Sequence, residues 1–177
     1  MKDLFRQLDR SPVTRRKAVW ATEFAYETMP AERKNGVSLA NQANYMADAM
    51  GIAAKTDRVP LFIWYVMTDP SEAADWQSGL LTATGAAKPS YFMYQRPVSP
   101  GTSVAKKGTV LKVWGKSNVA GGATIVMSTN GSTWKTAPGQ RRAADRSVTA
   151  TVKVTRKTYF AVKDGAGRGP SRLVAVR

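Results

Sequence analysis

The sequence contains no cysteine and no histidine among its 177 residues. Without cysteine the chain forms no disulfide and offers no thiolate nucleophile, although this absence does not fix the cellular compartment. Without histidine it lacks the commonest metal ligand and the commonest general base. Any catalysis must therefore use carboxylates, lysine, tyrosine or hydroxyl groups, and we expect neither a metal nor another cofactor.

Long hydrophobic runs are also missing. The longest strongly apolar stretch is LFIWYVM at residues 61–67, and seven residues are too few to span a bilayer. The first ten residues, MKDLFRQLDR, interleave charges with apolar side chains and contain no signal-peptide core. We therefore expect no membrane span and no signal peptide in this chain.

Acidic residues become scarce in the second half of the sequence. Residues 1–96 hold 12 Lys/Arg and 10 Asp/Glu, whereas residues 97–177 hold 15 Lys/Arg and 2 Asp/Glu. The net charges are +2 and +13, and the break coincides with a linker-like stretch, RPVSPG, at residues 96–101. This shift predicts two units with different surfaces, divided at residue 97.

The first unit shows strands and helices in alternation. Near-continuous apolar runs predict strands covered on both faces. Ser38 is placed to cap a helix whose apolar positions follow a helical period, and Pro89 suits the first turn of another helix. This order is typical of a parallel sheet. The expected elements are the end of a helix at 2–9, strands at 18–23 and 59–67, helices at 39–54 and after Pro89, and a possible helical turn at 75–81.

The second unit changes to a period of two. The stretch VTATVKV at residues 148–154 alternates apolar with polar side chains, and Asn130-Gly131 is a strong hairpin signal. Frequent turns between short strands suggest a small β-sandwich. Asn130 also begins a glycosylation sequon, but the hairpin explains it better. The expected strands are 109–114, 123–129, 148–154, 158–163 and 172–176.

Five stretches of residues 1–96 follow one another as in a known family: VWATEFAYE, GVSLANQANYMADAM, VPLFIWYVMTDP, WQSGLL and GAAKPSY. Their order resembles the end of a (β/α)8 barrel in retaining glycoside hydrolases, and is similar to the clan that includes family 5 and family 39. The resemblance implies an α/β fold, the last two βα units of an incomplete TIM barrel, followed by the small immunoglobulin-like or fibronectin-like β-sandwich. It also implies hydrolysis of a poly- or oligosaccharide.

The resemblance implies roles for particular residues. In these families a glutamate at the end of the seventh strand is the nucleophile, which matches Glu23 in TEF. The position at a strand end agrees with this role, although by itself it also fits an ordinary surface charge. A tryptophan of the eighth strand lies under the sugar, which matches Trp64; the alternative is a core side chain. Tyr26, Asp69 and Trp76 would contact substrate at the same end, or lie on the surface as solvated loop residues.

Retaining hydrolysis needs a second carboxylate about 5 Å from the first. In the resembled families this acid/base glutamate follows the fourth strand, so we expect it to be absent from this chain. Glu27, Glu32 and Glu72 are available, but their spacing marks none of them as a replacement. The expected function is therefore that of a C-terminal fragment of a glycosidase, inactive alone. The parent enzyme would act outside the cell or at the cell wall.

The basic second unit suggests an alternative, a non-catalytic binding module. Its excess of cations would attract an anionic cell-wall polymer or acidic polysaccharide, and Trp114 and Trp134 are available for stacking. A merely solubilising surface is the simpler interpretation. Nucleic acid is disfavoured, because no sequence signature of a nucleic-acid-binding fold is visible.

Overall fold

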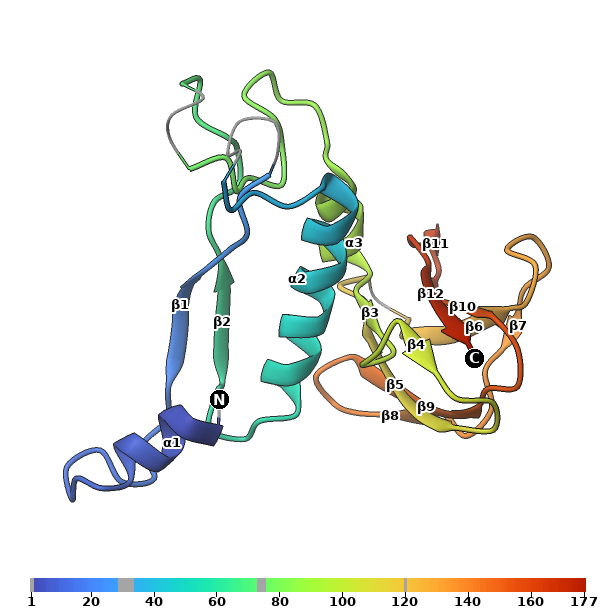
Figure 1. Cartoon of the computed structure of the whole chain (residues 1–177), viewed down its shortest axis with the longest axis horizontal. Coiled ribbons are helices and arrows are strands. Elements are labelled where there is room, and N and C mark those ends of the chain that lie inside the picture. Colours follow the sequence, from blue (N-terminus) through green and yellow to red (C-terminus); the bar gives the residue numbers. More distant parts are fainter. Residues whose placement is uncertain (1, 29–33, 73–75, 120) are drawn as a thin grey trace.

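The structure is a computed structural model, and it describes residues 2–28, 34–72, 76–119 and 121–177. In this part of the chain three helices accompany twelve strands. Figure 1 shows the long helix α2 lying between a small two-stranded sheet and a sandwich of two larger sheets. The N-terminal elements are α1 (Lys2–Leu8), β1 (Trp20–Phe24), α2 (Leu39–Ala54), β2 (Leu61–Trp64) and α3 (Pro89–Gln95).

The predicted fold class is wrong: the expected last two βα units of an incomplete TIM barrel are not found in the described chain. Strands β1 and β2 pair in parallel, but they make up a sheet of their own, and no further strand within the described ranges joins it. Most of the remaining elements are the strands of the sandwich. The apolar run predicted strands covered on both faces, whereas Trp20 is 66% exposed. A local pattern identifies a strand and says nothing about how many neighbours pair with it.

The local signals around the helices are confirmed. Ser38 is the N-cap of α2, and its Oγ accepts a hydrogen bond from the Asn41 amide at 3.2 Å. Pro89 occupies the first turn of α3. The expected helical turn at 75–81 is not formed by residues 76–81, and Asp75 lies outside the described residues. Helices α2 and α3 pack against each other, with Met46 and Met93 fully buried.

The sandwich contains all five strands expected from the sequence. Its larger sheet has the order β4-β12-β10-β6-β7, with β11 paired to β10, and its smaller sheet has the order β3-β5-β9-β8. The strands are β3 (Val98–Ser99), β4 (Val104–Ala105), β5 (Val110–Lys116), β6 (Thr124–Ser128), β7 (Lys135–Thr136), β8 (Arg141–Arg142), β9 (Ser147–Lys153), β10 (Thr158–Asp164), β11 (Gly167–Arg168) and β12 (Arg172–Val176).

The two sheets bury a shared apolar core. Phe160, Val162, Ile125 and Val113 have no exposed surface, and Val148 has almost none. The expected hairpin is confirmed: β6 and β7 are antiparallel. The Asn130 side chain accepts hydrogen bonds from the amides of the two residues after Gly131, so its role in the structure is to hold the turn.

Helix α2 joins the two parts of the chain. The carboxylate of Asp48 accepts hydrogen bonds from Arg172 of β12, at 3.0 Å, and from the Ser99 hydroxyl of β3, at 2.6 Å. A Cβ on Gly51 would lie 3.1 Å from the Ser99 side chain and 3.2 Å from the Trp114 ring, so glycine permits the close approach. The division into two domains at residue 97 stays a prediction.

Candidate functional site

The candidate site is a hollow at the carboxyl ends of β1 and β2. Because both strands run in the same direction, the segments that follow them emerge at one edge of the sheet. The Tyr65 amide donates a hydrogen bond to the Phe24 carbonyl at 3.1 Å, which holds the two strand ends together. We call this cavity the Glu23 hollow; it has a volume of about 290 Å³ and is lined by Glu23, Phe24, Ala25, Glu27, Tyr65 and Trp76.

Two carboxylates and two aromatic side chains share the Glu23 hollow. Glu23 is exposed, and in the described part of the chain no hydrogen bond or ion pair engages its carboxylate. Glu27 is half-buried, and Tyr65 and Trp76 are 38% and 64% exposed. Large exposed aromatic rings beside carboxylates are the kind of surface on which a sugar ring stacks while its hydroxyl groups are hydrogen-bonded.

The loops that carry these side chains are tied together by backbone hydrogen bonds. The amide of Thr28, which follows Glu27, donates to the carbonyl of Gln77, which follows Trp76, at 3.1 Å. The Thr28 hydroxyl donates to the same carbonyl at 3.0 Å. The backbone next to Glu27 is therefore joined directly to the backbone next to Trp76, although the two residues are far apart in the sequence.

A buried ion pair lies next to this junction. The Lys88 ammonium is 2.6 Å from Oδ2 of Asp69, and it also donates to the Thr28 hydroxyl at 3.1 Å. The other oxygen of Asp69 accepts a hydrogen bond from the Gly79 amide at 2.7 Å. Both charged side chains are almost completely removed from solvent. Asp69, predicted to contact substrate, thus lies in the interior and holds the loops in place.

A buried side chain of α2, Gln42, also forms hydrogen bonds to these loops. Gln42 has no exposed surface, and its amide nitrogen donates to the carbonyls of Tyr26 and Ser78 at 2.9 and 3.2 Å. Its amide oxygen accepts a hydrogen bond from the Ser90 hydroxyl of α3 at 2.7 Å. One side chain therefore ties together two helices and two loops behind the Glu23 hollow.

The structure brings only part of the predicted set of site residues together. Glu23 and Trp76 line the same hollow. Trp64 is 7% exposed and donates from its indole nitrogen to the Ser78 carbonyl at 2.9 Å, so it packs inside. Tyr26 meets the Phe24 ring edge to face and the Tyr45 ring at a tilt, and it lines a separate apolar cavity between the two-stranded sheet and α2.

Two lining residues were missed or left unmarked in the sequence. Tyr65 directly follows Trp64 in the apolar run, and alternation along a strand would have assigned the two neighbouring aromatics to opposite sides. Glu27 was one of three available carboxylates, and only the folded loop places it beside Glu23. Glu32 lies outside the described residues, and Glu72 is exposed and does not line the hollow.

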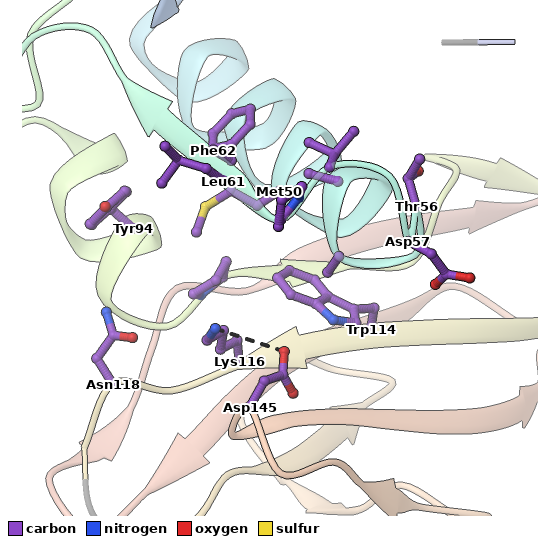
Figure 2. A pocket seen from close by; sticks show the side chains of 15 residues that line it. Met50, Thr56, Asp57, Leu61, Phe62, Tyr94, Trp114, Lys116, Asn118 and Asp145 are labelled. Atoms are coloured by element: carbon purple, nitrogen blue, oxygen red, sulfur yellow. Dashed lines mark ion pairs between the residues drawn. The ribbon is translucent and has the colours of Figure 1, made fainter. Parts of the chain in front are cut away.

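A larger cavity, of about 470 Å³, lies where α2 and β2 meet the sandwich. Figure 2 shows Met50, Leu61 and Phe62 on one side of it and Trp114 on the other. Its pair of facing charges, Lys116 and Asp145, compensate each other at a distance of 3.8 Å. We interpret this cavity as the junction between the two parts of the chain, because its lining residues come from α2 and β2 on one side and from the sandwich on the other.

Neither a metal centre nor a membrane helix is found in the described part of the chain. No three Asp or Glu side chains gather there in a way that would hold a metal ion. None of the helices in the same ranges has the length and apolar character needed to cross a membrane.

Comparisons with known proteins give a distant likeness among solved structures. No family model matches the sequence, and no curated protein matches it. Among solved structures the chain is similar to a calcium-binding mutant of Bacteroides uniformis beta-glucuronidase 2, with a TM-score of 0.45 and 13% identity. The match covers 99% of this chain and 23% of the other, so the chain spans less than a quarter of that protein's length. The chain is thus distantly similar in structure to a glycoside hydrolase.

Proposed function

We propose that the Glu23 hollow binds carbohydrate and that Glu23 is the nucleophile of a retaining glycoside hydrolase. The observation that carries this proposal is the meeting of two carboxylates, Glu23 and Glu27, with the exposed rings of Tyr65 and Trp76 in one hollow. The resemblance of the TEF stretch to nucleophile motifs supports the same role for Glu23.

In the proposed reaction a carboxylate oxygen of Glu23 forms a bond to the anomeric carbon of the sugar. The bond from that carbon to the leaving oxygen breaks, and its electron pair stays on the oxygen, which a general acid protonates. Water then attacks the glycosyl ester and releases Glu23. Tyr65 and Trp76 would hold the sugar ring by stacking.

The proposed reaction also requires a general acid to protonate the leaving oxygen. Glu27 is the other carboxylate that lines the hollow in the described ranges, and we do not assign it the acid's role on position alone. We therefore propose that the chain by itself hydrolyses ordinary glycosides slowly or not at all. A substrate whose leaving group departs as a stable anion needs no acid, and the nucleophile is then tested separately.

The experiment uses fluorosugars with a dinitrophenolate leaving group. The fluorine slows hydrolysis of the glycosyl ester, so an enzyme with a working nucleophile accumulates the adduct. We expect a panel of such gluco-, manno-, galacto- and xylosides and of a glucuronide to include one that adds a single sugar to the chain. Peptide mass spectrometry should locate it on Glu23.

Three variants make the test specific. Glu23→Gln should abolish the adduct, whereas Glu72→Gln, a matched change of an exposed carboxylate outside the hollow, should leave the rate of labelling unchanged. Glu27→Gln should still be labelled on Glu23. An adduct on Glu27, or equal labelling of the Glu23→Gln variant, would show that the proposed nucleophile is wrong.

A further inference from the structure

A hollow separate from the Glu23 hollow lies on the outer face of the larger sheet of the sandwich. It has a volume of about 540 Å³, within the usual range for small-ligand sites. Strands β6, β7, β10 and β11 and the β8 residue Arg142 contribute to it. Four exposed cations line it, and we call it the basic hollow: Lys135, Arg142, Lys163 and Arg168.

Two of these cations lie opposite each other across a pair of strands. Lys163 and Arg168 are direct partners across the antiparallel pair of β10 and β11, an arrangement in which like charges are unfavourable. No ion pair joins any of the four cations to a carboxylate within the ranges that the structure describes.

The one acidic residue among the lining residues of the basic hollow already has other partners. Asp164 also lines the basic hollow, but its side chain is fully buried. Its carboxylate accepts hydrogen bonds from Arg96 at 2.7 Å and from the Ser117 hydroxyl at 2.6 Å. Asp164 therefore compensates Arg96 and leaves the four cations of the hollow with an excess of positive charge.

Two of the guanidinium groups are held in place before any ligand arrives. Arg142 donates to the Ala123 carbonyl at 3.1 Å and to the Thr124 hydroxyl at 3.2 Å. Arg168 lies over the ring of Trp134, 4.1 Å from its centroid. The indole is fixed in turn by a hydrogen bond to the Gly131 carbonyl. Fixed donors lose less conformational freedom on binding, and a planar guanidinium suits carboxylate and sulfate groups.

We propose that the basic hollow binds an acidic polysaccharide, with the carboxylate or sulfate groups of the sugar held by Arg142, Lys163 and Arg168. The hydroxyls of Thr124 and Thr136, which line the same hollow, would meet the sugar hydroxyls. A single-stranded nucleic acid would need successive exposed aromatic platforms. Trp134 is the one aromatic residue among the lining residues, and its face carries Arg168. This proposal does not depend on the Glu23 hollow.

The test compares two double variants that remove the same charge. Lys163→Gln/Arg168→Gln removes two cations of the hollow, and Lys106→Gln/Lys107→Gln removes two exposed cations outside it. The first pair relieves the repulsion between β10 and β11 and also removes the contact of Arg168 with the Trp134 ring. These small effects oppose each other, so the thermal midpoint should stay close to that of the wild type. A loss of binding would then not be a loss of fold.

The probes are polygalacturonate for carboxylates and dextran sulfate for sulfates, with neutral dextran as the control. Binding of the full chain is measured by affinity electrophoresis at low salt and at about 0.15 M salt. We expect Lys163→Gln/Arg168→Gln to weaken binding to at least one acidic polymer about tenfold, as expected for lost hydrogen bonds to charged groups. Lys106→Gln/Lys107→Gln should change it less than about twofold, since surface charges far from a ligand are screened.

Three results would overturn the proposal. Equal weakening by both double variants would mean diffuse attraction by the net charge. Retention of neutral dextran equal to that of both acidic polymers would exclude charge recognition. Tighter binding of duplex DNA than of either acidic polymer at the same salt concentration would assign the basic surface to nucleic acid instead.

Discussion

The ammonium nitrogen of Lys88 lies 2.6 Å from Oδ2 of Asp69, and the two side chains are only 2% and 6% exposed. The pair joins the loop after β2 to the N-cap residue of α3. Removal of one partner leaves an uncompensated charge in the interior. We expect Lys88→Met to lower the free energy of unfolding by about 3–5 kcal/mol, measured by urea denaturation.

The double variant Lys88→Met/Asp69→Asn separates the charge from the packing. The asparagine is uncharged, and its amide oxygen still accepts the hydrogen bond from the Gly79 amide. The double variant should therefore be more stable than Lys88→Met alone. If Lys88→Met is as stable as the wild type, the pair does not hold the loops.

The acid sensitivity of the chain should depend on Asp164. Burial alone would raise the pKa of this carboxyl, but hydrogen bonds from Ser117, Arg96 and the Ala166 amide together hold the pKa below its ordinary value of 3.8. A carboxyl with a lowered folded-state pKa stabilises the fold above 3.8, and this contribution is lost as the pH falls through the folded-state pKa. We expect Asp164→Asn to be less stable than the wild type at pH 7.

The prediction is checked by the difference in free energy of unfolding between the wild type and Asp164→Asn as the pH is lowered. Urea unfolding at neutral pH and in steps below pH 3.8 should show their free energies of unfolding converging. Asp9 and Asp145 also have lowered pKa values, but both proteins retain them. A constant difference at all pH values would contradict a role for the ionised Asp164.

Gly115 permits the close packing of the two sheets. A Cβ at this position would lie 2.5 Å from Cγ2 of Val162 on the facing sheet. Gly115→Ala should therefore destabilise the fold by about 1–3 kcal/mol through overpacking. Gly165→Ala, at a glycine with open space around its Cβ position, should be close to neutral in the same thermal unfolding measurement.

A double-mutant cycle tests whether the clash itself is the cause. Val162→Ala removes the methyl group that the new Cβ would meet, so Gly115→Ala should cost less in that background than in the wild type. Additive effects of the two substitutions would mean that Gly115 matters for its backbone and not for the space beside it.

Replacement of two tryptophans near the Glu23 hollow should have very different effects on the stability of the fold. Trp76 is 64% exposed, so Trp76→Ala should change the free energy of unfolding by less than about 0.5 kcal/mol. If Trp76 stacks on the sugar, the same variant should slow labelling of Glu23 by the fluorosugar about tenfold.

Trp64 provides the contrast. It is buried and donates to the Ser78 carbonyl, so Trp64→Ala should destabilise the fold by about 3–5 kcal/mol. A variant of Trp76 that unfolds as easily as this one, or a Trp64 variant of unchanged stability, would reverse the roles assigned to the two side chains.

Short-range signals predicted the elements well. Ser38, Pro89 and Asn130-Gly131 act within a few residues of themselves, and helix α2, helix α3 and the β6–β7 hairpin form where these signals stand. Alternation over residues 148–154 identified the buried face of β9, because each apolar residue there faces the opposite sheet.

Relations between distant segments could not be predicted in the same way. Nothing in the sequence near Lys88 marks Asp69 as its partner. Only the resemblance assigned Glu23 and Trp76 to the same end of the fold, and nothing in the sequence marked Tyr65 as a third residue of their hollow. The apolar runs around Trp20 and Leu61 predicted parallel strands, but the number of strands in their sheet depends on what else packs there. The prediction of the last two βα units of a TIM barrel, taken from the resemblance, was wrong for this reason.

Helix α2 links the Glu23 hollow to the sandwich. Gln42, near its first turn, holds the loops behind the Glu23 hollow, and Asp48, six residues later and about 9 Å along the axis, holds the sandwich through Arg172 and Ser99. Both sets of hydrogen bonds depend on the orientation of α2 about its own axis. The helix therefore couples the two parts of the chain. A rotation of the sandwich relative to the two-stranded sheet would break the hydrogen bonds of Asp48, or it would rotate the helix and displace Gln42 together with the loops that carry the carboxylates.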